Sequence, residues 1–187
     1  MDPNNRNFID LGLGYTLEPL DFDDNRNKYS YLYMSGQKIS DMIFRKGGLG
    51  GTFIDGYCSL ISYPNFKLKE GSDQESEFGT HCIVNLKGDI AMSEEDRFSH
   101  DLYHIKGLVA KKKDSYYNLV TSEIIVLASS NSRVETDEFI WVEHKYDFDY
   151  YTANGEKKFP MGVYKINCYT GDVEFYKKEM NINTIKI

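Results

Sequence analysis

From residue 29 onward, the chain is a succession of short apolar-rich runs separated by turn-forming residues. Runs such as 29–34, 57–63 and 139–146 are rich in Tyr, Ile, Val and Phe, which is typical of β-strands. The turn-forming pairs Asn154-Gly155 and Thr170-Gly171 separate the last runs. The pattern predicts a mainly β fold of sequential antiparallel hairpins, stacked as repeat-like units.

One segment carries a clear helix-start signal. Ser93 is followed three positions later by Asp96, with acidic residues between them, as in a capping box. We expect a short helix here, running to about Tyr103. Because alanine is scarce and no other segment shows such a signal, the fold should contain at most one or two short helices.

The composition changes near residue 28, and this change divides the chain. Residues 1–28 are rich in Asp and Asn, and we expect them to form an N-terminal acidic extension that lies over the core. Residues 29–187 should form a single β-rich domain. Its repeat-like units are expected at about 29–77, 78–127 and 128–178. The apolar positions predict a core of Leu32, Ile39, Ile43, Phe53, Cys58, Leu60, Cys82, Val84, Val109, Leu119, Ile125, Ile140, Val142, Ile166 and Val173.

The repeat hypothesis rests on pairs of similar segments. The sequence around Gly36 resembles that around Gly88, and the sequence around Gly56 resembles that around Gly107 at nearly the same separation. Looser copies occur at 116–124 and 166–173. A hairpin unit cannot bury a whole face alone, so such units should stack on one another.

Residues 53–60 (FIDGYCSL) and 78–90 (FGTHCIVNLKGDI) resemble the bacterial WG (KWG) repeat. The segments 104–112 and 117–125 look like a second, weaker copy. The sequence departs from the family where its Trp-Gly pair should stand, because Phe78-Gly79 and Asp114-Ser115 occupy those places. The resemblance implies a β-rich repeat module without a catalytic centre of its own.

The charge balance limits the classes of partner that the chain is expected to bind. Lys and Arg number 22 against 29 Asp and Glu, a formal net charge of −7, which disfavours nucleic acid and anionic membranes as partners. The dense basic cluster Lys111–Lys113 is expected at the exposed tip of a hairpin. With three dispersed cysteines, no secretory signal pattern and no spanning apolar run, we expect a reduced, cytoplasmic protein without a cofactor.

Several motifs resemble chemical sites but lack essential residues. The glycine run 47–51 has no following Lys for a phosphate loop, and 21–27 lacks the Gly and Glu of an EF-hand. His100 and His104 would align on a helix as zinc ligands, although nothing in the spacing supplies the remaining ligands. Cys82 would need a distant histidine, because its neighbour on a strand points to the opposite face. Structural roles are therefore favoured.

The stretch 143–151 carries the candidate site. If it is extended, its carboxylates alternate onto one face and its aromatic residues onto the other. Three interpretations stay open: the solvent face of a core strand, a protein-recognition surface, or an acid/base or metal pair. The recognition interpretation assigns partner binding to Glu143, Tyr146, Asp147, Asp149, Tyr150 and Tyr151, with no catalytic or metal-ligating residues.

Three functional hypotheses follow from these observations. The first is a non-catalytic acidic protein-binding module, in concrete form an immunity or inhibitor protein for a basic partner. The second is a WG-like structural repeat that serves as an adaptor or sensor. The third is a metal-dependent hydrolase using Asp147, Asp149 and histidines.

Overall fold

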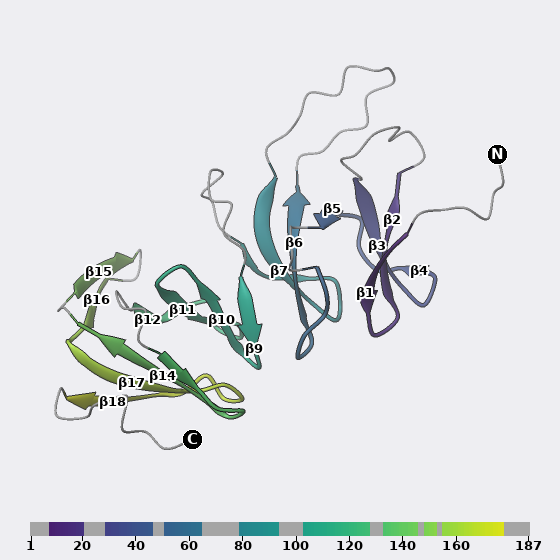
Figure 1. Cartoon of the computed structure of the whole chain (residues 1–187). Helices are drawn as coiled ribbons and strands as arrows, with labels where there is room; N and C mark the ends of the chain where they lie inside the picture. Colours follow the sequence, from purple (N-terminus) through teal and green to yellow (C-terminus); the bar gives the residue numbers. More distant parts are fainter. Residues whose placement is uncertain are drawn as a thin grey trace. The chain divides into compact units, whose positions relative to one another are not determined.

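The computed structural model describes residues 8–20, 29–46, 51–64, 79–93, 103–127, 133–145, 148–152 and 155–177. Every regular element in these ranges is a β-strand, and neighbouring strands pair antiparallel (Figure 1). The prediction of a mainly β fold of sequential antiparallel hairpins is confirmed. The helix expected after Ser93 falls on residues outside the described ranges. No helix in the described part of the chain is long and apolar enough to cross a membrane.

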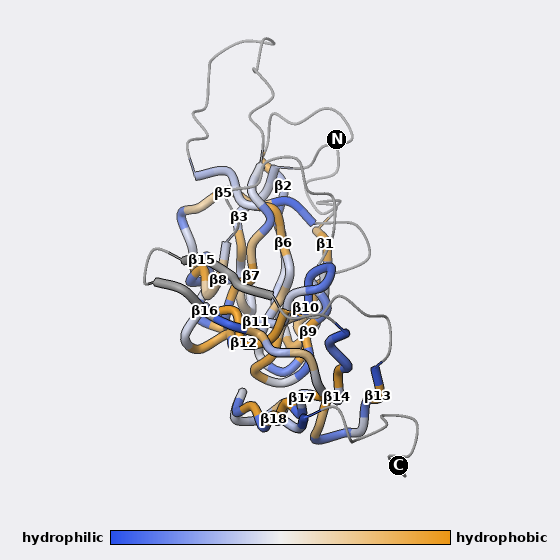
Figure 2. Tube along the Cα trace, turned by 90° about the vertical axis from the view of Figure 1, so that its left-hand side faces the viewer, coloured by the Kyte–Doolittle hydropathy of each residue, from blue (hydrophilic) through white to orange (hydrophobic). Residues whose placement is uncertain are grey.

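The chain forms two compact units, residues 1–103 and 104–187. The division between Tyr103 and His104 falls inside the repeat-like unit expected at 78–127, within the stretch 29–187 that is expected to form a single domain. Hydrophobic and hydrophilic residues alternate along many of the strands in both units (Figure 2).

The first unit is one eight-stranded sheet in the order β1-β2-β3-β5-β6-β7-β8, with β4 paired to β3. Its strands are β1 (Ile9–Gly12), β2 (Tyr15–Pro19), β3 (Ser30–Met34), β4 (Gln37–Lys38), β5 (Ile43–Lys46), β6 (Tyr57–Tyr63), β7 (Thr80–Asn85) and β8 (Ile90–Ser93). Three of its hairpin turns, Leu13-Gly14, Ser35-Gly36 and Asp55-Gly56, have positive φ at both central residues. This is the type I′ geometry that matches the twist of paired strands.

The sheet curves back on itself and encloses a core. The amide of Phe53 donates to the carbonyl of Leu11 at 2.7 Å, and the Tyr15 hydroxyl donates to the carbonyl of Leu86 at 2.7 Å. Leu11 and Leu17 are fully buried in the same cluster as Cys58 and Cys82. Residues 9–19 are therefore two strands of the sheet that supply core residues, which is more than the covering extension expected for 1–28.

The second unit contains two four-stranded sheets and a two-stranded ribbon. The first sheet, β12-β11-β10-β9, comprises β9 (His104–Lys106), β10 (Val109–Lys112), β11 (Ser115–Asn118) and β12 (Ile124–Leu127). The second sheet, β13-β14-β17-β18, comprises β13 (Arg133–Glu135), β14 (Phe139–His144), β17 (Gly162–Asn167) and β18 (Val173–Lys177). The ribbon pairs β15 (Phe148–Thr152) with β16 (Gly155–Phe159).

The two sheets of the second unit share one core. Val109, Tyr116 and Val126 from the first sheet cluster with Ile140 and Ile166 from the second. Every position predicted for the core is either buried or packed against a buried cluster, across both units. The alternation of apolar and polar residues therefore identified the inward faces correctly.

The loops that follow β11 and β17 have the same hydrogen bonds. The side-chain Oδ1 of Asn118 accepts the amides of Val120 at 2.8 Å and Thr121 at 3.2 Å. The Oδ1 of Asn167 likewise accepts the two amides that follow it by two and three positions, at 2.8 and 3.1 Å. The fifth residue of each loop, Ser122 or Gly171, has a positive φ. A shorter version, closed by Asn85, follows β7.

Candidate protein-binding face

The stretch 143–151 is divided between two elements of the second unit. β14 ends at His144 in the four-stranded sheet, whereas Asp149 lies on β15 in the separate ribbon. The single extended strand on which the sequence argument depended is therefore not formed. Tyr146 and Asp147 are outside the described residues, and of Asp149, Tyr150 and Tyr151 only the backbone is described.

Along β14 the expected alternation does hold. Ile140, Val142 and His144 are buried, whereas Phe139, Trp141 and Glu143 are half-buried on the opposite side of the strand. His144 is a core residue, 1% exposed. Glu143 thus faces away from the core, as predicted, but it shares its side of the sheet with the single tryptophan of the chain.

The register of the sheet gathers aromatic and charged side chains on that side. Trp141 lies across from Lys165 of β17, and Lys165 lies across from Glu174 of β18. Glu143 lies across from Val163, which lies across from Tyr176. We call this surface the outer face and define it by Phe139, Trp141, Glu143, Lys165, Glu174 and Tyr176.

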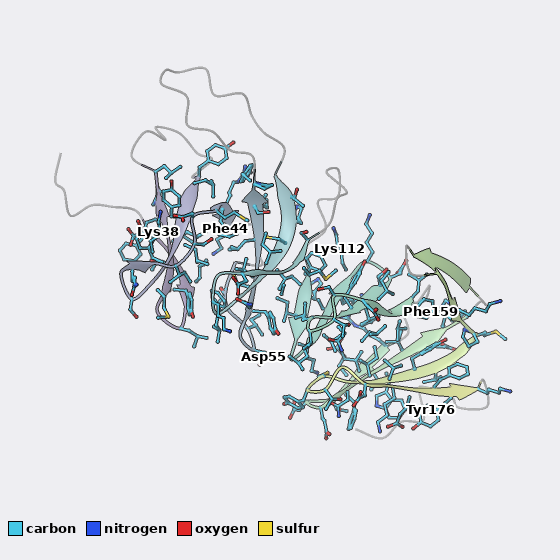
Figure 3. The ribbon with its side chains drawn as sticks, turned by 180° about the vertical axis from the view of Figure 1, so that it is seen from behind. Lys38, Phe44, Asp55, Lys112, Phe159 and Tyr176 are labelled. Atoms are coloured by element: carbon cyan, nitrogen blue, oxygen red, sulfur yellow. The ribbon has the colours of Figure 1, made fainter. Side chains whose placement is uncertain are left out.

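Ring contacts and one ion pair fix the side chains of the outer face. The ammonium of Lys165 lies 4.1 Å from the centroid of the Phe139 ring and 5.5 Å from that of Trp141. It also lies 3.4 Å from a carboxylate oxygen of Glu174. The Trp141 and Tyr176 rings are 5.8 Å apart, and Figure 3 shows Tyr176 at the outer edge of the second unit. The lysine is thus held among aromatic rings and a carboxylate before any partner arrives.

The hydrogen bond from the Tyr176 hydroxyl to Glu174 perturbs both groups. It lowers the pKa of the Glu174 carboxyl, to which the Lys165 ammonium contributes as well, and it raises the pKa of Tyr176. Glu174 is therefore ionised at neutral pH. With Glu143 it places two carboxylates against one ammonium on the outer face.

The ribbon is less acidic than the sequence of β15 indicates. Its register places Asp149 across from Lys158, Tyr150 across from Lys157, and Tyr151 across from Glu156. The register thus gives Asp149 a lysine as its cross-strand neighbour, which a strand-by-strand analysis of the sequence cannot place.

The ribbon also has the position of an insertion. In the first sheet of this unit, the second and third strands are joined by the two-residue turn Lys113-Asp114. In the second sheet, the second and third strands are β14 and β17, and their connection, 145–161, contains the ribbon. The following loops, after Asn118 and Asn167, are equivalent. The ribbon is thus additional to the four-stranded pattern that both sheets share.

The described cysteine and histidine residues considered for catalysis or metal binding lie in the core or on a strand. Cys58 and Cys82 are fully buried, and burial raises the pKa of each thiol to about 12, so both are protonated at neutral pH. His104 lies on strand β9, not on the helix that would align it with His100. Within the described ranges no group of three or more His, Cys, Asp or Glu side chains could hold a metal ion.

The run Lys111–Lys113 is less exposed than expected. Lys111–Lys113 does end a hairpin, with Lys113 exposed in the turn, but Lys112 is buried and Lys111 is half-buried. Successive side chains on a strand point to opposite faces, so a run of three cannot all lie at the tip. Sequence reasoning also missed most of the outer face, although the alternation Phe139-x-Trp141-x-Glu143 was a usable signal.

Comparisons with protein-family models, with curated proteins and with solved structures found no match to this chain. The WG-repeat resemblance stays a prediction that rests on the residues quoted for it.

Proposed function

We propose that this chain is a non-catalytic module that binds another protein through the outer face and the adjoining ribbon. The observation that carries the proposal is the gathering of Phe139, Trp141 and Tyr176 around Lys165 outside the hydrophobic core. Aromatic residues dominate the energetics of protein interfaces, and they are enriched there relative to the rest of a protein surface.

The preorganisation of the outer face favours tight binding. Immobilising a long, flexible side chain at an interface costs about 0.5–1.5 kcal/mol. Lys165 already has its ammonium over two rings and beside Glu174, so much of that cost is met during folding. A partner therefore encounters a surface whose side chains need little further ordering.

The charge of the molecule favours a basic partner. The net charge is −7, and on the outer face Glu143 and Glu174 outnumber Lys165. Such a field raises the association rate of a positively charged protein, and salt weakens the attraction. In its most concrete form, the proposal is an immunity or inhibitor protein that neutralises a basic toxin or effector.

A degenerate repeat adaptor is the second candidate. The recurrence of the same asparagine-closed loop after β11 and β17, with a shorter form after β7, supports a chain built from related hairpin units. An adaptor of this kind would bind a partner without relying on net charge.

The test is capture of partners by the tagged full-length protein from lysate of its own cells, at low and at high salt. Trp141→Ala should lose the partner. The matched control is Tyr169→Ala, which removes an aromatic residue that is 62% exposed in a loop of the same unit. With the purified partner, quenching or shift of the single tryptophan's fluorescence should report binding directly.

The outcomes separate the candidates. A stoichiometric basic protein that is lost at high salt and by Trp141→Ala supports the inhibitor. A partner that resists high salt and still depends on Trp141 supports the adaptor. A partner retained equally by Trp141→Ala and Tyr169→Ala would refute the outer face as its binding surface.

A further inference from the structure

A second feature of the C-terminal unit is a cavity of about 230 Å³ on the inner side of its second sheet. It lies where β9 and β13, the edge strands of the two sheets, approach each other. Its lining includes the charged residues Lys106, Lys111, Arg133 and Glu135, and its apolar part includes Tyr116 and Ile140. Arg133 and Ile140 lie on the side of the sheet opposite Val134 and Trp141, so the cavity and the outer face are separate surfaces.

Contacts across the two edge strands hold the mouth of the cavity. The ammonium of Lys106, on β9, donates a hydrogen bond to the carbonyl of Thr136, just after β13. It also lies 3.8 Å from the carboxylate of Glu135, which pairs with the Nε of Arg133 at 3.2 Å. The mouth therefore has a defined arrangement of charged groups.

The cavity carries more positive than negative charge. Lys106, Lys111 and Arg133 contribute three cations, and Glu135 contributes the one carboxylate of the lining. Glu135 is shared by Lys106 and Arg133. Lys111 forms no ion pair among the described residues, and its ammonium lies 6.0 Å from the centroid of the Tyr116 ring. This excess stands out in a chain whose net charge is −7.

The surroundings disfavour the charge on Lys111. Burial is the main cause that lowers its pKa, and the nearby guanidinium of Arg133 lowers it further, while Asp114 and Glu135 oppose the shift. Burial also raises the pKa of the Tyr116 hydroxyl, and the positive charge of the nearby Arg133 opposes this rise. An anion placed between Lys111 and Arg133 would relieve the repulsion between these two cations.

The inner wall of the cavity is apolar. Val109, Tyr116 and Ile140 are all buried and belong to the core that joins the two sheets. Pockets for drug-sized ligands are roughly 300–1,000 Å³, so this smaller volume suits a compact metabolite-sized molecule. Polar groups at the mouth and an apolar wall behind them are the usual construction of small-molecule sites.

We propose that this cavity binds a small organic anion. Its carboxylate or phosphate oxygens would contact Lys111 and Arg133, and its apolar part would pack against Tyr116, Val109 and Ile140. This site goes beyond the proposed protein-binding function, and the two can fail independently because they use opposite sides of the sheet.

The experiment is isothermal titration calorimetry of the full chain with inorganic phosphate, phenyl phosphate and benzoate. Phenyl phosphate should bind more tightly than inorganic phosphate, because its phenyl ring can pack against the apolar wall of the cavity. The comparison of phenyl phosphate with benzoate distinguishes a phosphate head group from a carboxylate. Lys111→Gln and Arg133→Gln should each weaken binding about tenfold or more, as expected for loss of a hydrogen bond to a charged group.

Two further variants keep the test decisive. Lys113→Gln is the matched control, since it removes the same charge from the same hairpin outside the cavity, and affinity should change less than about twofold. Glu135→Gln removes the carboxylate that competes for the cations, and affinity should rise about three- to tenfold. Absence of binding by all three probes, equal losses in Lys111→Gln and Lys113→Gln, or an affinity that Glu135→Gln leaves unchanged would each overturn the proposal.

Discussion

Replacing Gly171 by alanine adds one methyl group where the two asparagine loops of the second unit touch. Gly171 has φ +73°, a left-handed conformation that residues with a side chain rarely adopt. A Cβ built there would overlap the Nδ2 of Asn118 and lie 2.9 Å from its Cγ. The Asn118 side chain cannot move aside freely, because its Oδ1 accepts the amides of Val120 and Thr121.

The expected loss of stability has two parts. An L-residue in the left-handed region costs about 1 kcal/mol relative to glycine. Displacing the Asn118 amide weakens two hydrogen bonds worth about 0.5–1.5 kcal/mol each, with the lower end appropriate to an exposed loop. We therefore expect Gly171→Ala to lower the free energy of unfolding of the second unit by about 2–3 kcal/mol.

Urea denaturation followed by tryptophan fluorescence measures this loss. The chain has a single tryptophan, Trp141 on β14, so the signal reports the second unit. Gly36→Ala is the control for the backbone cost alone, since Gly36 has φ +81° and a Cβ there meets nothing within 4 Å. Followed by far-UV circular dichroism, this variant should lose only about 1 kcal/mol.

A double-variant cycle tests the reasoning itself. Asn118→Ala alone should cost about 1–2 kcal/mol, because it leaves two loop amides without their acceptor. Once the Asn118 amide is gone, Gly171→Ala should cost only its backbone share of about 1 kcal/mol. The double variant should therefore lose less stability than the sum of the losses in the two single variants. Strict additivity, or a Gly171→Ala variant as stable as the parent, would show that the two loops do not pack as described.

Three further predictions concern the first unit and the ribbon. Burial raises the pKa of Cys58 and Cys82 from 9.0 to about 12, so between these pH values only the unfolded state releases the thiol protons. The free energy of unfolding should therefore fall above pH 9 by up to about 1.4 kcal/mol per pH unit for each thiol. Denaturation midpoints that stay constant up to about pH 10.5 would contradict this. Leu11 is the fully buried residue of the N-terminal strand, so Leu11→Ala should cost the first unit about 2–5 kcal/mol by circular dichroism, whereas a loss below 1 kcal/mol would fit a loose extension. Replacing Asp147 and Asp149 together by Asn should slow association with a basic partner at low salt without changing the unfolding midpoint, and an unchanged association rate would exclude these two carboxylates from the encounter.

Local pattern determined much of this fold. Strand alternation marked the inward residues, such as Val142 and Ile166, because side chains on a strand alternate between its two faces whatever the strand packs against. The turns, like the strand alternation, depend on residues that are close together in the sequence. The similarity between 116–124 and 166–173 in the sequence corresponds to two loops with the same hydrogen bonds, since an asparagine can satisfy the amides that follow it without any distant partner.

The sites depended on strand order and register, which no local pattern specifies. Trp141 and Tyr176 are adjacent only because β14 and β18 flank β17 in the sheet. Lys111 and Arg133 line one cavity only because the edge strands of two sheets approach each other. Register also placed Lys158 opposite Asp149 and so altered the charge of the site predicted from the sequence. Sequence alone indicated which apolar side chains point into the core; the tertiary structure decided which side chains meet, because pairing between distant strands sets their neighbours.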